Sequence, residues 1–229
     1  MSDEFLVSSD RKGRYYYRTS EPSKKFRSVS TVIHWGEPKG KSNDSSKIGT
    51  IAHYMILRNL TDDNIDVPTE MPYWSNREDV DGRIEDAIIM WQQLEMEKVV
   101  EKWIAIEKAI WFEGVIDGVP VFYAGRIDGL AEFVDAKIRL VDIKTGDEYS
   151  EYIKQMGGYV QAIEFCMHIY IDEVWINYLD VGGNWIQATG QYVKRNVDRV
   201  PRVVVYNREQ IEEGIKLFNI DLLNVFRNE

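Results

Sequence analysis

The sequence predicts a mixed α/β domain in which helices flank a central β-sheet. The 229 residues suit one sizeable domain, and 44% of them are hydrophobic, which is enough for a packed core. Segments with helical periodicity also alternate with segments rich in β-forming residues, in the order helices, three strands, a helix, two strands and a helix. This order is typical of a single mixed α/β domain.

Four helices are expected where apolar residues recur three or four positions apart. The second of them would start at a cap on Asn76 and continue through Trp103. Loops rich in Gly, Pro, Ser or Asp are expected at 36–46 and 62–75. The other three helices are predicted from Ser45 or Ser46 to about Leu60, from about Tyr149 to Met167, and from Arg208 to Phe226.

The strands are expected in two hairpins and one single segment. Residues 104–112 and 121–133 would pair across Asp117-Gly118, a strong hairpin turn signal. Residues 138–144 read as a third strand. A second hairpin, with strands at 174–179 and 185–193, is predicted around the Gly182-Gly183-Asn184 segment.

The charge of the chain is unevenly distributed. The net charge is -10, which on its own disfavours a nucleic-acid partner. Residues 1–50, however, carry a net charge of +4, against -11 for residues 51–150 and -3 for residues 151–229. The basic region holds a Tyr15–Tyr17 run followed by further cations, and it suits either a phosphate backbone with stacked bases or an edge strand whose tyrosines cap a core. Its cations of interest are Arg14, Arg18, Lys24, Lys25 and Arg27.

Cysteine content and hydropathy favour an intracellular protein. Cys166 is the single cysteine, so neither an internal disulfide nor a four-cysteine zinc or iron–sulfur site is possible. The first ten residues lack the apolar region of a secretory signal, and no apolar run approaches the ~20 residues that cross a bilayer. We therefore expect a cytoplasmic or nucleoid-associated protein that is not secreted and has no membrane partner.

One strand end places chemically useful side chains together. Residues two apart in a strand share a face, so Asp142 and Lys144 project together while Val141 and Ile143 point to the other side. Asp128, in an apolar segment, would face Asp142 if their strands are neighbours. Two close carboxylates favour a bound cation, and the lysine could orient a water. The alternatives are a surface ion pair and a turn at Asp128-Gly129.

Two helices add further candidates. Gln155 and Tyr159 lie four residues apart and share a helical face. Between them, Gly157 and Gly158 indicate a close approach to the backbone, by a ligand or by tight packing of the helix on the sheet. His53 lies on the first helix, as a ligand or as a structural residue.

These motifs, taken in order, resemble those of the RecB-like branch of the PD-(D/E)XK nucleases. The resemblance runs from Gly-Thr-x-x-His ending at His53, through Gly-Arg-Ile-Asp-Gly at 125–129 and Asp-Ile-Lys-Thr-Gly at 142–146, to Gln-x-x-x-Tyr ending at Tyr159. It implies a restriction-endonuclease-like core, a central mixed sheet flanked by helices. Residues 1–229 would form one nuclease domain, with 1–45 as a basic N-terminal region and loop.

The resemblance also implies roles for individual residues. His53, Asp128, Asp142 and the backbone carbonyl of Ile143 would bind one or two Mg²⁺ or Mn²⁺ ions. Lys144 would position the attacking water and act with Asp128 and Asp142 in catalysis. Gln155 and Tyr159 would bind the substrate strand, the basic residues Arg14, Arg18, Lys24, Lys25 and Arg27 would hold its backbone, and Glu107 would have a supporting role.

The implied activity is metal-dependent hydrolysis of DNA, by an exonuclease or a nuclease specific for single strands or ends, in replication, recombination or repair. Because an imidazole ligand suits Mn²⁺ better than Mg²⁺, Mn²⁺ should support activity at least as well. A helicase or recombination partner would supply unwinding. Two alternatives stay open: a catalytically inactive nuclease fold that binds nucleic acid, and a domain whose acidic middle binds a protein.

Overall fold

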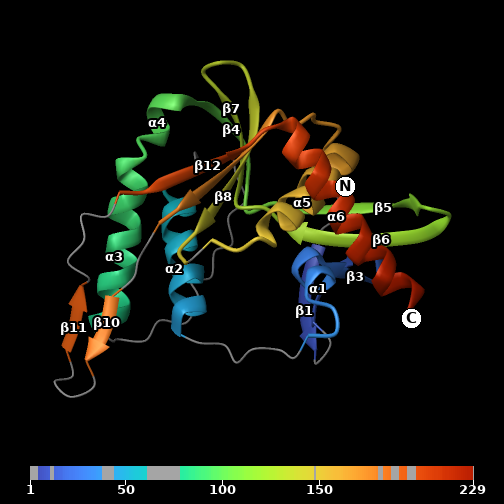
Figure 1. Cartoon of the computed structure of the whole chain (residues 1–229), viewed down its shortest axis with the longest axis horizontal. Helices are drawn as coiled ribbons and strands as arrows, with labels where there is room; N and C mark the ends of the chain where they lie inside the picture. The colour runs from blue at the N-terminus through green and yellow to red at the C-terminus, as the bar shows by residue number, and fades with distance from the viewer. Residues whose placement is uncertain are drawn as a thin grey trace.

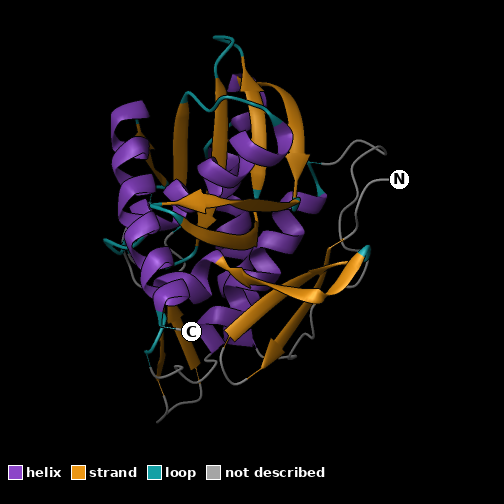
Figure 2. Cartoon of the chain, turned by 90° about the vertical axis from the view of Figure 1, so that its right-hand side faces the viewer, coloured by secondary structure: helices purple, strands orange, loops and turns teal. Residues whose placement is uncertain are grey.

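The chain forms a mixed α/β fold with two five-stranded mixed sheets and helices packed against them (Figure 1). The computed structural model describes residues 5–10, 13–37, 44–60, 78–146, 148–179, 183–186, 191–194 and 200–228. Figure 2 shows the strands of the two sheets in different orientations, with helices packed among them. The predicted α/β class is thus confirmed, and the strands form two sheets where one central sheet was expected.

The first sheet has the strand order β1-β2-β3-β6-β5. Its neighbours are antiparallel except β3 and β6, which are parallel. The β5–β6 hairpin turns at Asp117 and Gly118, both with positive φ (49° and 76°), so the predicted turn is confirmed. The strands are β1 Phe5–Asp10, β2 Gly13–Arg18, β3 Glu21–Ser28, β5 Ala109–Ile116 and β6 Val119–Arg126, and the short helix α1 Val29–Ile33 follows β3.

The second sheet has the strand order β12-β9-β8-β7-β4. Only β8 and β9 are parallel. A separate pair is formed by β10 (Gly183–Ile186) and β11 (Gln191–Lys194). The strands of the second sheet are β4 Val100–Ile106, β7 Gly129–Phe133, β8 Ile138–Lys144, β9 Glu173–Tyr178 and β12 Arg202–Tyr206.

Helices cover both faces of the second sheet. One core joins α2, α3 and α4 to the face of β8 that carries Val141 and Ile143. Another joins α5 and α6 to the opposite face, through Leu140 and Ile176, and also to the first sheet. The helices are α2 Asp44–Arg58, α3 Glu78–Gln93, α4 Met96–Val99, α5 Tyr152–Met167 and α6 Arg208–Arg227. No helix among the described residues combines the length and apolar character needed to span a membrane.

The predicted strands at 104–112 and 121–133 are each broken in two. The chain leaves β4 for β5 at Glu107-Lys108 and leaves β6 for β7 at Ile127-Asp128. The two breaks lie side by side, because the Glu107 N–H donates to the Asp128 carbonyl (3.0 Å) and the Ile127 N–H donates to the Lys108 carbonyl (3.1 Å). The left-handed φ of Glu107, 49°, interrupts the pleat there. One long hairpin therefore bends from one sheet into the other at this point.

Two further predictions on the elements are wrong. Trp103 belongs to β4 and not to a helix, because α3 ends at Gln93 and a strand that pairs with β7 begins at Val100, a β-branched residue. Residues 174–179 do not pair with 185–193, since β9 lies between β8 and β12. The predicted loop residues 38–43, the predicted loop at 62–75, the cap at Asn76 and the turn at Gly182 lie outside the described residues.

The basic N-terminal region, for which an edge strand was one of the two predicted alternatives, contains the strands β1, β2 and β3. Tyr15 and Tyr16 are buried in β2, which lies between β1 and β3 and is thus an interior strand, not an edge.

The glycine pair of α5 packs against helix α6, and the Gly158 carbonyl also accepts a hydrogen bond of 2.9 Å from the Tyr123 hydroxyl of β6. A Cβ at Gly157 would lie 2.2 Å from the Gly214 carbonyl carbon of α6, so only glycine allows this crossing.

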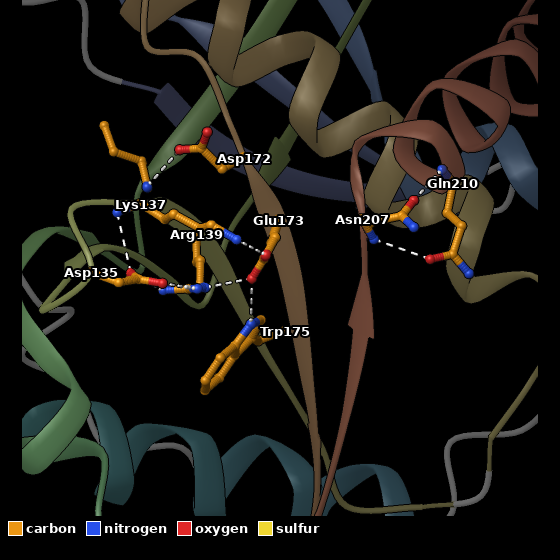
Figure 3. A network of polar contacts seen from close by, with 9 residues as sticks. Asp135, Lys137, Arg139, Asp172, Glu173, Trp175, Asn207 and Gln210 are labelled. Carbon is orange, nitrogen blue, oxygen red and sulfur yellow. Dashed lines mark hydrogen bonds and ion pairs between the residues drawn. The ribbon is translucent and has the colours of Figure 1, made fainter.

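A polar network around the buried Arg139 fixes the amino-terminal end of β8 (Figure 3). The Arg139 guanidinium donates to both Asp135 carboxylate oxygens (2.7 and 2.6 Å) and to Glu173 on β9 (2.7 Å). The Ile138 N–H donates to the Asp172 carboxylate (2.8 Å). Both strands of the parallel β8–β9 pair are thereby held in register, which positions the carboxyl end of β8 and the residues on it.

Candidate metal and catalytic site

The bend of the long hairpin carries a three-residue cluster of metal-binding type. Glu107 and Asp128 lie at the two breaks, and His53 approaches them from α2, the helix that packs on the Val141 and Ile143 face of β8. The ligand atoms of the three residues all lie within 4.8 Å of one another. The structure therefore brings together two of the predicted ligands, His53 and Asp128, and adds Glu107, which the sequence assigned only a supporting role.

Asp128 connects the helix, the bend and β8. Its Oδ2 lies 3.4 Å from the His53 Nδ1 and accepts a hydrogen bond of 2.8 Å from the Ile143 N–H. Burial opposes ionisation of Asp128, but His53, Lys144 and the Ile143 N–H together outweigh it and lower the pKa of that carboxyl. Burial would likewise lower the pKa of His53, but the Asp128 carboxylate raises it. The two groups thus stabilise each other's charged form.

Asp142 and Lys144 lie on one face of β8, as predicted. The Lys144 Nζ lies 2.6 Å from the Asp142 Oδ2, and only 15% and 4% of the two side chains are exposed. Burial raises the pKa of Asp142 to about 6, against the opposing effect of Lys144. For Lys144, burial is outweighed by Asp142 and Asp128, so its pKa is raised. The pair is buried, and the surface ion-pair alternative is therefore wrong.

Glu107 brings a second carboxylate close to Asp128. Burial and the charge of Asp128 raise the pKa of Glu107 to about 7. Arg126 partly compensates, with its Nη1 3.8 Å from the Glu107 carboxylate. The sequence signal that could have identified Glu107 is an acidic residue inside a run of β-forming residues, the same signal that singled out Asp128.

The predicted ligands Asp142 and Ile143 lie next to this cluster. In the β7–β8 register Gly129 faces Val141, so the next position places Asp128 opposite Asp142, as expected. Asp142 is not one of the three clustered ligands, and its buried Oδ2 is paired with the Lys144 ammonium. The Ile143 side chain is buried in the core, and the Ile143 backbone N–H donates a hydrogen bond to the Asp128 carboxylate. A ligand role for its carbonyl stays a prediction.

The donor set fits a divalent cation. It offers an imidazole nitrogen and two or three carboxylates, a combination that suits Mn²⁺ and, through its oxygens, Mg²⁺. One observation points the same way. Glu107 and Asp128 disfavour each other's charge. A cation between these two carboxylates would relieve their repulsion.

Gln155 and Tyr159 share the predicted face of α5. The Gln155 Nε2 donates to the Tyr159 hydroxyl at 3.0 Å. Burial, reinforced by Asp142, raises the pKa of Tyr159 far above its ordinary value, so the hydroxyl stays protonated. The pair therefore presents neutral hydrogen-bonding groups near Asp142.

Three glycines of the recognised motifs make room for large neighbours. A Cβ at Gly125 would lie 2.7 Å from the Tyr159 ring, and one at Gly129 would lie 2.6 Å from the Trp103 ring. At Gly49 of α2, a Cβ would lie 2.9 Å from the Thr145 Oγ1. The glycines at 125 and 129 let the bend and β7 pack closely, and Gly49 brings the helix of His53 against the end of β8.

The five basic residues of the N-terminal region differ in their surroundings. Arg14 and Lys25 are exposed. Arg18 and Lys24 both pair with Glu113 of β5. Arg27 is 7% exposed and donates to the Tyr15 hydroxyl at 3.0 Å. Two of the five thus face solvent, two share one counter-charge, and one is part of the packing.

Comparisons with known proteins add no family. No protein-family model matches the chain, and no curated protein sequence matches it. Among solved structures, the crystal structure of SSO0001 is similar with a TM-score of 0.31 and 9% sequence identity, over 85% of this chain and 83% of that chain. A similarity of this size carries no argument about fold or function, so any functional assignment depends on the geometry of the site itself.

Proposed function

We propose that this protein is a metal-dependent nuclease that hydrolyses phosphodiester bonds in DNA, with a restriction-endonuclease-like core. One observation carries the proposal. The clustered ligand atoms of His53, Glu107 and Asp128 lie within 4.8 Å of one another, and Asp128 is hydrogen-bonded to the strand that ends in the buried Asp142–Lys144 pair. The second sheet, with β8 central and helices on both faces, supports the proposed core.

Phosphodiester hydrolysis needs an oriented water and a site that balances the charge of the phosphate. A bound Mg²⁺ or Mn²⁺ would supply Lewis-acid polarisation of the phosphate and a water of lowered pKa. His53, Glu107, Asp128 and Asp142 would hold it. We assign Lys144 to the water and the phosphate, since its ammonium carries three donors and Asp142 fixes it at the strand end.

The residues around this centre would orient the substrate. Tyr159 keeps its proton and is held by Gln155, so it can donate one hydrogen bond to a phosphate oxygen. Arg14 and Lys25, which are exposed, would contact the backbone of the substrate. The substrates proposed are DNA ends or single strands, with unwinding supplied by a helicase or recombination partner.

The test is digestion of end-labelled linear and closed circular DNA, single- and double-stranded, in Mg²⁺, Mn²⁺ or EDTA. We expect cleavage with Mn²⁺ at least as fast as with Mg²⁺ and none in EDTA. Lys144→Ala should reduce the rate by about 10²- to 10³-fold, while Asp117→Asn, in the exposed β5–β6 turn, should leave it unchanged. Binding of DNA without metal-dependent cleavage of any substrate would support the inactive nucleic-acid-binding alternative instead.

A further inference from the structure

Three tyrosine rings gather beside Lys144 at the carboxyl end of β8. The Lys144 Nζ lies 4.8 Å from the centre of the Tyr152 ring, at the start of α5. Tyr152 lies 5.6 Å from Tyr149 in an edge-to-face arrangement of 86° and 6.2 Å from Tyr178 of β9. The rings therefore form a continuous aromatic face next to the proposed catalytic lysine.

The sheet register explains why this face extends away from the metal centre. Lys144 pairs with Tyr178 in the parallel β8–β9 ladder, and Tyr178 pairs with Arg202 of the edge strand β12. The Arg202 guanidinium lies 4.6 Å from the centre of the Tyr178 ring. Arg202 also forms an ion pair of 2.8 Å with Glu148. We assign the binding role to the rings and to Lys144, because Lys144 is the cation that belongs to the proposed catalytic centre.

Exposure increases along the face from the lysine to solvent. Tyr178 is 4% exposed, Tyr152 is half-buried, and Tyr149 is 55% exposed. Tyr149 therefore contributes little to the core, and its ring is available to a ligand. An aromatic ring that is both exposed and held by a neighbouring ring is suited to stacking with a flat group.

We propose that Tyr149, supported by Tyr152, stacks an unpaired base of a single-stranded nucleic acid whose neighbouring phosphate lies at Lys144. The inference rests on the proposed function, because it takes Lys144 as the phosphate contact. Stacking on a tyrosine requires a base that is free of its duplex neighbours, so the face selects single strands over duplexes. It tolerates any base sequence, since every base has a π-face.

Binding of a single-stranded oligonucleotide that carries 2-aminopurine, measured in EDTA so that no strand is cut, tests this assignment. We expect quenching of the probe by the wild type. Tyr149→Ala and Tyr149→Leu should weaken binding by about 5- to 100-fold and lose most of the quenching. Tyr149→Phe should keep both. Tyr170→Ala is the matched control, because Tyr170 is 57% exposed and lies beyond the far end of α5.

The outcomes separate this inference from the proposed function. Quenching that depends on the Tyr149 ring, in a protein that cuts no substrate with any metal, would support the base-binding face and overturn the nuclease. Metal-dependent cleavage together with unchanged binding and quenching by Tyr149→Ala would overturn the face alone. An equal loss for a duplex of the same sequence, or no binding of single strands by the wild type, would also overturn it. Thermal unfolding of each variant checks that the fold is retained.

Discussion

The Asp128 carboxylate accepts a hydrogen bond of 2.8 Å from the Ile143 backbone N–H. This bond ties the bend of the long hairpin to the strand that ends in Lys144. The Val141 and Ile143 side chains are buried on one face of that strand, and Asp142 projects from the other. The position of Asp142 and Lys144 relative to His53 and Glu107 therefore depends on one carboxylate that is also a proposed ligand.

Asp128→Asn should separate metal binding from folding. The amide oxygen still accepts the Ile143 N–H, so the fold should be kept, but one anionic ligand is lost. We expect the affinity for Mn²⁺, measured by calorimetry on the protein without DNA, to fall by at least about tenfold. Asp117→Asn removes the same charge in the exposed β5–β6 turn and is the control. Equal affinities of the two variants would exclude Asp128 as a ligand.

The Asp142–Lys144 pair should show strong coupling in unfolding experiments. Lys144→Met leaves a buried carboxylate without its counter-ion, which typically costs about 3–5 kcal/mol. Adding Asp142→Asn removes that charge, so the double variant should be more stable than Lys144→Met alone. Urea unfolding of the four proteins in EDTA measures the coupling energy. Strictly additive losses would show that the two side chains do not interact across their 2.6 Å contact.

Local periodicity predicted the parts of the site that depend on one element. The shared face of Asp142 and Lys144 follows from the two-residue repeat of a strand, and the Gln155–Tyr159 contact follows from the four-residue step of a helix. Both are set by backbone geometry alone. They were therefore predictable without knowledge of the neighbouring elements.

The bend that brings Glu107 to Asp128 was not predictable in this way. Both segments of the hairpin are rich in β-forming residues on either side of the break, so their pattern reads as continuous strands. The break exists because the hairpin passes from one sheet to the other, which is a tertiary effect. The neighbours of β9 were not predictable from the sequence for the same reason. Its apolar pattern indicates a strand, but the packing of α5 and α6 determines that it lies between β8 and β12.

Gly157→Ala should destabilise the protein through the helix crossing. The added Cβ would lie 2.2 Å from the Gly214 carbonyl carbon and 2.4 Å from the Ile215 nitrogen, and backbone atoms cannot rotate away. We expect a loss near the upper end of the roughly 1–3 kcal/mol seen for overpacked cores, despite the better helix propensity of alanine. Gly146→Ala, with nothing within 4 Å of its Cβ, is the control. Equal urea midpoints would contradict the close crossing.

Acid stability should report on the network around Arg139. Two hydrogen bonds from Arg139 lower the pKa of Asp135 to about 2. An aspartate in the unfolded chain has a pKa of about 4. The stabilisation of the fold by Asp135 is therefore fully present above that pH and is lost as the pH falls toward about 2. The urea midpoint of the wild type should therefore drop more between about pH 4.5 and 3 than that of Asp135→Asn. Parallel pH profiles would show that Asp135 does not stabilise the network.

The salt dependence of DNA binding should distinguish the basic residues of the N-terminal region. Arg14 and Lys25 are exposed, so replacing each with Gln should reduce the slope of log K against log salt by about 0.7 for single strands. Arg18 and Lys24 share Glu113, so their replacement should change the slope less. Arg27→Gln should lower the unfolding free energy and leave the slope unchanged, because Arg27 is buried against Tyr15 and Trp35.

This last comparison tests a local explanation of a globally acidic chain. If Arg14 and Lys25 hold the backbone, the net charge of -10 does not prevent binding, since the Debye length at physiological salt is only about 8 Å and the acidic groups beyond it are screened. Binding should then weaken steeply with salt in the wild type and less so in the double variant that combines Arg14→Gln with Lys25→Gln. An unchanged slope in that variant would assign the basic residues to packing of the first sheet and would leave the substrate backbone to Lys144 and its neighbours.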